Sequence, residues 1–388
     1  MTSAPRPATF APMAAAPTTT WLVTGFPSWI ARSIVREIAE QEEGALVHLL
    51  VPEDRAKEAA EFCRGLRALG STVKVLPGDA VRMDLGLTGK DYVALAGSVD
   101  LFVNAYDVSP LRDDGFGGYG GLYGRLGDPV ELTVKAVREA VEFALLSKRL
   151  RQLVQIGSLT VAGDFDGVWT EEDLSIGQRH RTAAERARHG AERLLWRERE
   201  RVRFTILRTG PVVGDSRTGE IGWYHGPHDL LEAILVQPPA TGWGRTPPPE
   251  ALHLVPCDHL ARLVRAVGAS PPERSGVLHV APTVPVPLEQ IREALRAAGG
   301  KPPMARSVRS RLRKRYGAGA SSISRTLARI DTPAACSTRR ALDVERAAGI
   351  AQPRPVDYLP HLAAHAMARL AAEAQRIAAA GIEDSLDG

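Results

Sequence analysis

Residues 24–31, which read Thr-Gly-Phe-Pro-Ser-Trp-Ile-Ala, have the layout of a turn that binds a dinucleotide. They follow the apolar run 21–23 and open a run with helical spacing of apolar residues. In such a turn, glycines let the backbone approach a pyrophosphate at the N-terminus of a helix. Gly25 supplies the tight turn, but Ser28 stands where the backbone would pass closest to the pyrophosphate, and Ala31 where the helix packs on the strand. The stretch therefore predicts the fold more strongly than the chemistry.

Short apolar runs alternate with amphipathic ones over most of the chain, which is typical of strands followed by helices. The strand-like runs are 21–23, 45–51, 73–76, 101–103, 153–156 and 204–207, and the helix-like runs are 30–38, 56–69, 130–146 and 183–196. Beyond a Gly- and Pro-rich stretch at 209–249, strand-like runs 252–255 and 277–280 alternate with helix-like runs 259–267 and 288–298, and an Ala-rich helical run covers 362–380. Right-handed crossovers between such strands give a parallel sheet covered on both faces. We predict an α/β protein with a Rossmann-type doubly wound parallel sheet.

The composition is that of an ordinary globular protein, with 388 residues, 44% hydrophobic and 24% charged. Its formal net charge of +4 is small for this length, so nucleic acid is not the favoured partner. Three widely separated cysteines give neither a disulfide framework nor zinc-ligand spacing, which suits a reducing cytoplasm. Residues 2–20 are rich in Ala, Pro and Thr and lack the apolar core of a signal peptide, and no run approaches the ~20 apolar residues of a membrane span. We expect a soluble, cytoplasmic protein with a disordered leader.

Several short motifs follow one another in an order that is typical of one family. They are Val23-Thr24-Gly25, Gly78-Asp79, Leu85-Gly86-Leu87 leading to Val99-Asp100, the segment GSLTVAG at 157–163, the segment ILRTGPVVGDSRTG at 206–219, and Val255-Pro256-Cys257-Asp258. In these motifs the sequence resembles the extended short-chain dehydrogenase/reductase family, particularly the branch of thioester reductases and male-sterility-type fatty acyl reductases. The resemblance spans nearly the whole chain.

The resemblance implies a division of the chain into parts. Residues 1–20 would be the leader, and residues 21–210 an NAD(P)-binding Rossmann domain that is completed by about 252–282. Residues 211–251 and 283–300 would form a smaller substrate-binding part, and residues 301–388 a basic, helical C-terminal extension.

The same resemblance places Ser158 where the family hydrogen-bonds the substrate carbonyl, although a serine that caps a turn is the alternative. Counting back from Glu192 puts Arg188 in the place of the family's catalytic lysine and Ala184 in that of its tyrosine. Alanine has no proton to give, and the loss of a general acid typically slows a reaction by a factor of about 10² to 10⁴. Arg188 keeps the ability to bind a ribose hydroxyl.

Four other side chains are candidates for the missing acid. His180 lies one helical turn before Ala184 and titrates near neutrality. Tyr119 and Tyr123 lie in the glycine-rich run 115–127, and Tyr224 lies in the substrate-side segment. Each also has a simpler interpretation, as an exposed histidine or as a tyrosine that only packs.

The cofactor implied by the resemblance is NAD or NADP, and the altered motifs leave open that its binding is lost. Its pocket would be lined by Thr24, Gly25, Pro27, Ser28, Trp29 and Ile30 in the first turn, by Glu53, Arg55 and Asp79 after the second and third strands, by Asn104, Ala105 and Tyr106 after the fourth, and by Arg188, Thr209 and Val212. Asp79 would contact adenine, Glu53 a ribose hydroxyl and Arg55 a phosphate. Tyr106 and Asp107 would crowd or reshape the floor on which the nicotinamide rests.

The densest charge run consists of Arg306, Arg309, Arg311, Arg313, Lys314 and Arg315. A solvated helical face is the simpler interpretation. The sharper hypothesis is a docking site for an acyl carrier protein, because guanidinium groups pair bidentately with phosphate. The sequence leaves a homodimer open.

Two hypotheses about function follow from the resemblance. The first is an NAD(P)-dependent oxidoreductase that acts on a carbonyl or thioester of an acyl- or polyketide-type substrate in lipid or specialised metabolism. The second is a non-redox protein on the same scaffold, namely a cyclase, lyase or isomerase, or a nucleotide-binding pseudoenzyme. A module that only binds a partner through its basic C-terminal region is a third, minor possibility.

Overall fold

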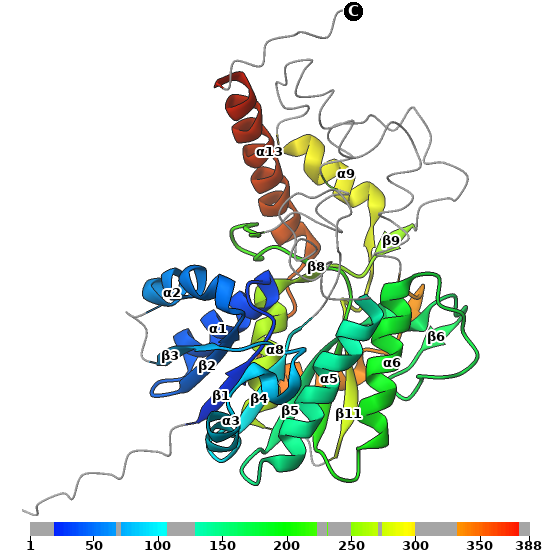
Figure 1. The fold of residues 1–388 in the computed structure, drawn as a ribbon. Coiled ribbons are helices and arrows are strands. Elements are labelled where there is room, and N and C mark those ends of the chain that lie inside the picture. Colours follow the sequence, from blue (N-terminus) through cyan, green and yellow to red (C-terminus); the bar gives the residue numbers. More distant parts are fainter. Residues whose placement is uncertain are drawn as a thin grey trace, which may run out of the picture.

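A central sheet of seven parallel strands organises the part of the chain that the computed structural model describes, residues 19–66, 71–106, 129–222, 231, 250–270, 274–298 and 332–379 (Figure 1). The strands are β1 (Thr20–Val23), β2 (Leu46–Val51), β3 (Thr72–Pro77), β4 (Leu101–Asn104), β5 (Gln152–Ser158), β7 (Phe204–Thr209) and β11 (Gly276–Val280). Their order is β11-β7-β5-β4-β1-β2-β3, with Trp21 of β1 paired to Val47 on one side and to Leu101 on the other. This confirms the predicted doubly wound fold.

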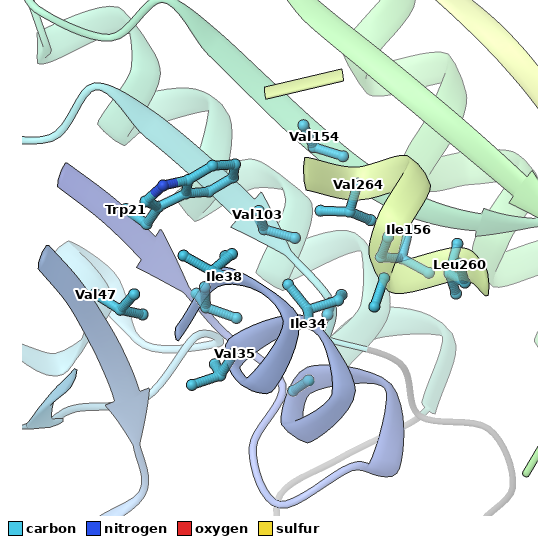
Figure 2. Packing of buried hydrophobic residues seen from close by; sticks show 14 of the residues in the cluster. Trp21, Ile34, Val35, Ile38, Val47, Val103, Val154, Ile156, Leu260 and Val264 are labelled. Carbon is cyan, nitrogen blue, oxygen red and sulfur yellow. The ribbon is translucent and has the colours of Figure 1, made fainter. Parts of the chain in front are cut away.

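Helices cover both faces of the sheet. On one face lie α1 (Trp29–Gln41), α2 (Ala56–Gly65) and α8 (Cys257–Ala269), and on the other α3 (Gly89–Ala96), α5 (Pro129–Leu146) and α6 (Ala183–Arg197). The core of the first face joins Trp21 of β1 to Ile34 and Ile38 of α1 and to Val264 of α8, all buried (Figure 2). Both faces of the strands are therefore hydrophobic, as in a parallel sheet flanked by helices on both sides.

A smaller layer lies beyond the carboxyl end of β7. It contains α9 (Leu288–Ala297) and α13 (Pro355–Ala379), which pack against each other, and the antiparallel pair of β9 (Ala251–Leu252) and β12 (Val286–Pro287) (Figure 1). Its own cluster of buried side chains includes Val213, Leu252, Ile291 and Leu362. Because β8 (Val212–Val213) pairs with β10 (Val255–Pro256), the chain that leaves β7 links the sheet to this layer.

The remaining elements complete the sheet edges and turns. They are β6 (Val168–Trp169) paired with β13 (Ala335–Cys336), the helix α12 (Arg339–Ala348), and the short 3₁₀ helices η1 (Glu53–Arg55), η2 (Met83–Gly86) and η3 (Leu159–Ala162). Within the ranges given above, no helix has the length and apolar character needed to cross a bilayer.

Some elements differ from the sequence-based expectation. The run 252–255 is not one strand, because its two ends belong to β9 and β10, which pair with different partners. The C-terminal helix α13 begins at Pro355, seven residues before the predicted start, and α3 and α12 were not predicted. Thr20, which we assigned to the leader, already belongs to β1.

Candidate functional site

The candidate site lies at the carboxyl ends of β1, β4 and β5. The chain leaves β1 toward α1 on one face of the sheet and leaves β4 toward α5 on the other. Ligands of open α/β sheets bind where consecutive connections diverge in this way. The motifs singled out in the sequence at 24–31, 104–106 and 158–163 all lie at this edge.

Gly25 is required by the geometry of the turn after β1. Its φ of +92° lies in the region that favours glycine, and a Cβ built on it would lie 2.2 Å from the carbonyl oxygen of Ala105. The turn therefore packs directly on the backbone that leaves β4. Any side chain at position 25 would force the two segments apart.

Ser28 caps helix α1. Its Oγ accepts a hydrogen bond from the N–H of Ala31 at 3.1 Å, and its own N–H donates to the Gly25 carbonyl at 2.9 Å. The first turn of α1 contains no acidic side chain, so the positive end of the helix dipole faces the site without local compensation. Thus Ser28 stands where a glycine was expected, and it caps the helix at the place predicted for the pyrophosphate.

Thr24 and Asn104 are joined to each other inside the sheet. The Thr24 hydroxyl donates to Asn104 Oδ1 at 2.6 Å, and Asn104 Nδ2 donates to Gln155 Oε1 at 2.8 Å. All three side chains are buried. This chain of hydrogen bonds ties the carboxyl ends of β1 and β4 to the middle of β5. The side chains of Thr24 and Asn104 thus serve the frame of the site, and their contact with a cofactor stays a prediction.

Ala105 and Tyr106 follow β4 and are both buried. The Tyr106 ring belongs to the hydrophobic cluster between the sheet and helices α3, α5 and α6, together with Phe102 and Leu132. The ring thus contributes to the core on that face. Its predicted crowding of a nicotinamide stays a prediction.

Two arginines lie at the end of the site near β2, and only one of them was predicted. Arg55 Nη1 lies 3.4 Å from Glu58, and Arg32 of α1 forms an ion pair with the same carboxylate. The Arg32 guanidinium also lies over the Phe26 ring, 4.6 Å from its centroid, and its Nε donates to the Pro27 carbonyl at 3.1 Å. Arg32 therefore braces the turn while placing a positive charge beside it.

Two predicted acidic contacts differ in their surroundings. Glu53, in η1, is exposed. Asp79, after β3, is half-buried, and burial raises the pKa of its carboxyl group, while a hydrogen bond from the Val81 N–H at 3.1 Å acts in the opposite direction. Asp79 thus has a structural role in its turn in addition to its predicted contact with adenine.

Ser158 ends β5 and lies at the centre of the site. Its Oγ accepts the Thr160 N–H at 3.3 Å and the Thr160 hydroxyl at 3.0 Å. Thr160 Oγ1 in turn accepts Arg188 Nη1 from helix α6 at 3.0 Å. The structure thus brings Ser158 and Arg188 together through Thr160, a residue that the sequence analysis did not single out.

Ala184 and His180 lie on the N-terminal side of Arg188. Ala184 is half-buried in the first turn of α6, one helical turn before Arg188. His180 Nε2 lies 3.2 Å from the Val161 carbonyl, and its ring packs against that of His189 in a tilted arrangement, with centroids 4.5 Å apart. Burial, and secondly the neighbouring His180, lower the pKa of His189. The His180 ring is thus held by the loop after β5 and by its neighbour on α6.

Tyr119, Tyr123 and Tyr224, and the basic cluster from Arg306 to Arg315, lie outside the described residues.

Helix α6 is fixed to the sheet by a buried ion pair. Glu192, one turn after Arg188, accepts Arg208 Nη2 at 2.8 Å and Nε at 3.0 Å, and Arg208 is 0% exposed. Arg208 Nη1 lies 3.2 Å from His279 Nε2, and burial, followed by the charge of Arg208, lowers the pKa of His279 to about 3. The pair sets the position of α6 relative to β7, and with it the position of Arg188.

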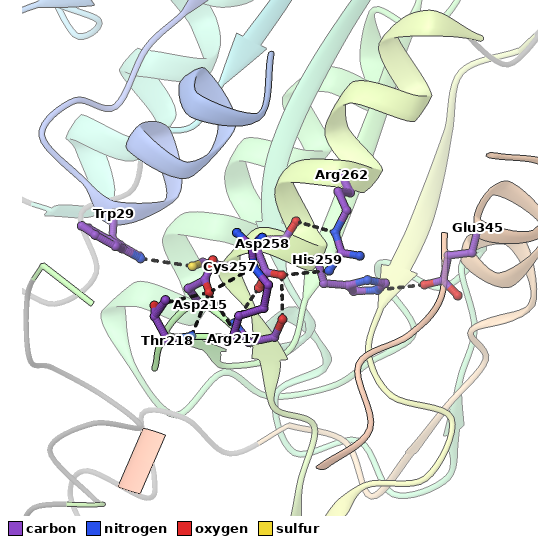
Figure 3. A network of polar contacts seen from close by, with 10 residues as sticks. Trp29, Asp215, Arg217, Thr218, Cys257, Asp258, His259, Arg262 and Glu345 are labelled. Atoms are coloured by element: carbon purple, nitrogen blue, oxygen red, sulfur yellow. Dashed lines mark hydrogen bonds and ion pairs between the residues drawn. The ribbon is translucent and has the colours of Figure 1, made fainter. Parts of the chain in front are cut away.

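The chain after β7 runs alongside this site. Thr209 Oγ1 donates to the Gly157 carbonyl at 3.3 Å, and Val212 starts β8. Further on, Asp258 accepts the N–H and the hydroxyl of Ser216 at 2.9 and 2.7 Å and an N–H of Arg262 at 2.8 Å (Figure 3). The segment from Thr209 to Ser216 is therefore anchored at both ends.

Two further contacts in this network join distant elements (Figure 3). Trp29 Nε1, at the start of α1, donates to Cys257 Sγ at the start of α8 at 3.1 Å, and burial raises the pKa of the Cys257 thiol to about 12. His259 Nε2 lies 2.9 Å from Glu345 of α12, and both side chains are buried. The α12 helix is thereby attached to α8, which packs on the central sheet. Cys257 remains a neutral thiol at physiological pH, which argues against a nucleophilic role.

Comparisons with known proteins agree with this architecture. A model of an NAD-binding family described as "Male sterility protein" matches residues 23–264. No curated protein sequence matches the chain.

Three solved structures illustrate the structural likeness. The terminal R domain from the myxalamid PKS-NRPS biosynthetic pathway is 18% identical with a TM-score of 0.69, covering 93% of this chain and 92% of that one. A thiolation-reductase di-domain from an archaeal non-ribosomal peptide synthetase is 16% identical with a TM-score of 0.65, covering 89% of this chain and 74% of that one. UDP-glucose 4-epimerase from Bifidobacterium longum, in complex with NAD+ and UDP, is 15% identical with a TM-score of 0.58, covering 90% of this chain and 97% of that one. At these identities the likeness shows the fold.

Proposed function

The chain belongs to the male sterility protein family, and we propose that it is a nicotinamide-dependent reductase that acts on the carbonyl or thioester of an acyl substrate. The observation that carries the proposal is the placement of Ser158 at the carboxyl end of β5, linked to Arg188 through Thr160. A hydroxyl at this edge of a doubly wound sheet is suited to hold a carbonyl oxygen beside a bound dinucleotide.

The first turn of α1 fits a dinucleotide pyrophosphate. The leading N–H groups of a helix have no acceptor within the helix, and the dipole favours an anion there. Ser28 Oγ satisfies the N–H of Ala31, which leaves the N–H groups of Trp29 and Ile30 as the natural donors. Gly25 would let the backbone turn beneath the cofactor. The cofactor, when bound, would supply hydride to the substrate carbon.

The roles of the protein side chains follow from their positions. Ser158 would donate a hydrogen bond to the substrate oxygen and fix its orientation. Arg188, half-buried on α6, would bring positive charge to the same oxygen or to a ribose hydroxyl. Ala184 has no proton to transfer, so the oxygen would take its proton from water. We expect a slow reductase compared with one that carries a tyrosine at this place, by a factor of about 10² to 10⁴.

A carrier-bound substrate is part of the proposal. Two of the similar structures are described as an R domain of a PKS-NRPS pathway and as a thiolation-reductase di-domain. In this chain the basic cluster from Arg306 to Arg315 would meet the phosphate or the acidic surface of the carrier. Charge reversal at Arg311 and Arg313 should abolish carrier binding, and unchanged binding would end this part of the proposal.

A non-redox activity is the second candidate, and one observation favours it. The place of the general acid is held by Ala184, and the turn for the pyrophosphate holds a capping serine, so the two positions that hydride chemistry most needs are both altered. A cyclisation, elimination or isomerisation at the same edge of the sheet would need neither.

Calorimetric titration of the protein with NADH and with NADPH separates the two candidates. Micromolar binding of either supports the reductase, and no binding of either favours the non-redox activity. Ser28→Gly serves as a matched variant, because it restores a glycine where the backbone meets the pyrophosphate and loses only a few tenths of a kcal/mol of capping. If this turn binds the dinucleotide, Ser28→Gly should bind it more tightly than the unaltered protein.

A further inference from the structure

We propose that Arg188, Thr160 and Ser158 form a polarised hydrogen-bond relay that replaces the missing acid by stabilising a substrate oxyanion. The inference rests on the proposed carbonyl substrate, but it concerns how this chain holds the oxygen, and it adds Thr160 to the site. The relay consists of the 3.0 Å contact from Arg188 Nη1 to Thr160 Oγ1 and the 3.0 Å contact from Thr160 Oγ1 to Ser158 Oγ.

The direction of the relay follows from the chemistry of its members. A guanidinium group has five N–H donors and no acceptor, so Thr160 must accept at its end of the contact with Arg188. The arrangement of lowest electrostatic energy turns each hydroxyl hydrogen away from the cation, from Thr160 toward Ser158 and from Ser158 outward. Ser158 Oγ also accepts the Thr160 N–H at 3.3 Å, so both of its lone pairs are engaged by Thr160. The Ser158 hydrogen is then the group left to donate to a ligand.

The burial of Thr160 and Ser158 agrees with this direction. Thr160 is only 5% exposed, whereas Ser158 is half-buried at the edge of the sheet. The middle of the relay is therefore shielded from water, which strengthens its electrostatic interactions. The helix α6 that carries Arg188 is fixed by the buried contact of Glu192 with Arg208, so the relay starts from a rigid element.

The relay stabilises charge but does not supply a proton. A bound reduced nicotinamide dinucleotide would supply hydride to the carbonyl carbon, and the C=O electron pair would move onto the oxygen. The resulting alkoxide would accept the Ser158 hydrogen bond and then take a proton from water, which leaves hydroxide. With a thioester the product of this step would be a hemithioacetal, which would release the thiol to give the aldehyde. Because serine, threonine and arginine side chains do not titrate between about pH 6 and pH 9, the relay should work equally well across that range.

The first test is spectroscopic and needs no turnover. An octanoyl-pantetheine thioester labelled with ¹³C at the carbonyl is bound to the protein without nucleotide, and its C=O stretching frequency is measured by isotope-edited infrared spectroscopy. The relay predicts a shift to lower frequency on binding. Thr160→Val, which keeps the shape and loses the hydroxyl, should reduce the shift, Ser158→Ala should remove it, and Thr160→Ser, which keeps a hydroxyl, should retain it.

The second test is kinetic, with the same thioester and a reduced nicotinamide dinucleotide. Ser158→Ala should lower kcat by about 10² to 10³, as for the loss of an oxyanion donor, and Thr160→Val should lower it by about 10-fold, as for one hydrogen bond. The profile of kcat against pH should be flat from pH 6 to pH 9. A profile with a limb in that range would show that a titrating group controls the step, which contradicts the relay.

The two proposals fail in different ways. An unshifted carbonyl, a shift that is the same in Thr160→Val as in the unaltered protein, or failure of the thioester to bind would each overturn the relay, whatever the calorimetry with NADH and NADPH shows. A shifted carbonyl that depends on Thr160, in a protein that binds neither nucleotide, would support the relay and overturn the reductase.

Discussion

Replacing Glu192 by alanine should destabilise the protein far more than the loss of a surface charge. Arg208 is 0% exposed and directs three of its hydrogen bonds at the two Glu192 carboxylate oxygens, at 2.8, 3.0 and 3.2 Å. In Glu192→Ala the hydrogen-bond contacts left to Arg208 are the Thr170 carbonyl at 3.4 Å and His279 Nε2 at 3.2 Å, and its guanidinium still lies over the Trp169 ring, 5.6 Å from the centroid. None of these groups carries negative charge. A buried cation left without its partner typically costs about 3 to 5 kcal/mol. We expect the free energy of unfolding to fall by that amount.

Equilibrium unfolding in urea, followed by far-UV circular dichroism, measures the effect. Two variants are matched controls. Glu289→Ala removes a carboxylate that pairs with Arg292 and Arg296 on the surface of α9, and it should leave the urea midpoint unchanged. The double variant Glu192→Leu/Arg208→Met removes both charges, and it should recover most of the lost stability.

The reasoning would be refuted by a loss of less than about 1 kcal/mol in Glu192→Ala, which is the range of exposed pairs. It would also be refuted if the double variant were as unstable as the single one, because the unpaired charge would then not be the cause.

Three further predictions concern pH, the turn and the nucleotide. Burial, followed by the charge of Arg208, lowers the pKa of His279 to about 3 in the folded state, so the unfolded state binds a proton at higher pH than the folded state does. The contribution of His279 to stability should be complete above about pH 6.5 and should fall as the pH drops toward 3. His279→Asn should flatten this dependence in urea midpoints measured against pH. Gly25→Ala combines a positive φ with a Cβ only 2.2 Å from the Ala105 carbonyl oxygen, and it should destabilise the protein by more than about 2 kcal/mol. Gly44→Ala has a φ of +75° but open space around its Cβ, so it should cost about 1 kcal/mol, and thermal denaturation compares the two variants. Glu58→Gln removes the carboxylate that Arg32 and Arg55 share, which frees their positive charge for a 2′-phosphate. The affinity for NADPH relative to NADH should then rise by about 2- to 5-fold in calorimetry. An unchanged ratio would show that these arginines do not meet the 2′-phosphate.

The inner strands could be predicted from the sequence because they carry short apolar runs that are buried, as in β1 and β4, whereas the edge strand β3 is only partly buried. Helices α3 and α12 were not predicted, and few buried apolar residues mark either of them. In α3 only Tyr92, Leu95 and Ala96 are buried, behind a cap from Thr88. In α12 the buried residues are Ala341 and Glu345, and a buried glutamate gives no apolar signal. The burial of Glu345 depends on its contact with His259, which lies 86 positions away in the sequence.

For much of the candidate site, the sequence predicted where the residues lie in the fold but not which side chains contact each other. The residues at 24–31, 104–106 and 158 lie at one edge of the sheet, as the family resemblance implied. The role of Thr160 depends on the short helix η3, in which Ser158 acts as the N-cap and brings the two hydroxyls to 3.0 Å. A second hydroxyl two residues after Ser158 was the available signal. The role of Arg32 was less evident from the sequence, because its position beside Glu58 depends on how α1 packs against α2.

The intact parts of the frame do not by themselves argue for redox chemistry. The buried Glu192–Arg208 pair and the chain from Thr24 through Asn104 to Gln155 are internally satisfied polar groups, and breaking either would cost stability in a protein of any function. Their presence is explained by the fold alone. Chemistry must be judged at the groups placed at the carboxyl edge of the sheet, which include the first turn of α1 and the Ser158 hydroxyl. A reductase therefore needs both of them to bind a ligand, the dinucleotide at the turn and the carbonyl oxygen at the serine, and the two binding measurements test these requirements separately.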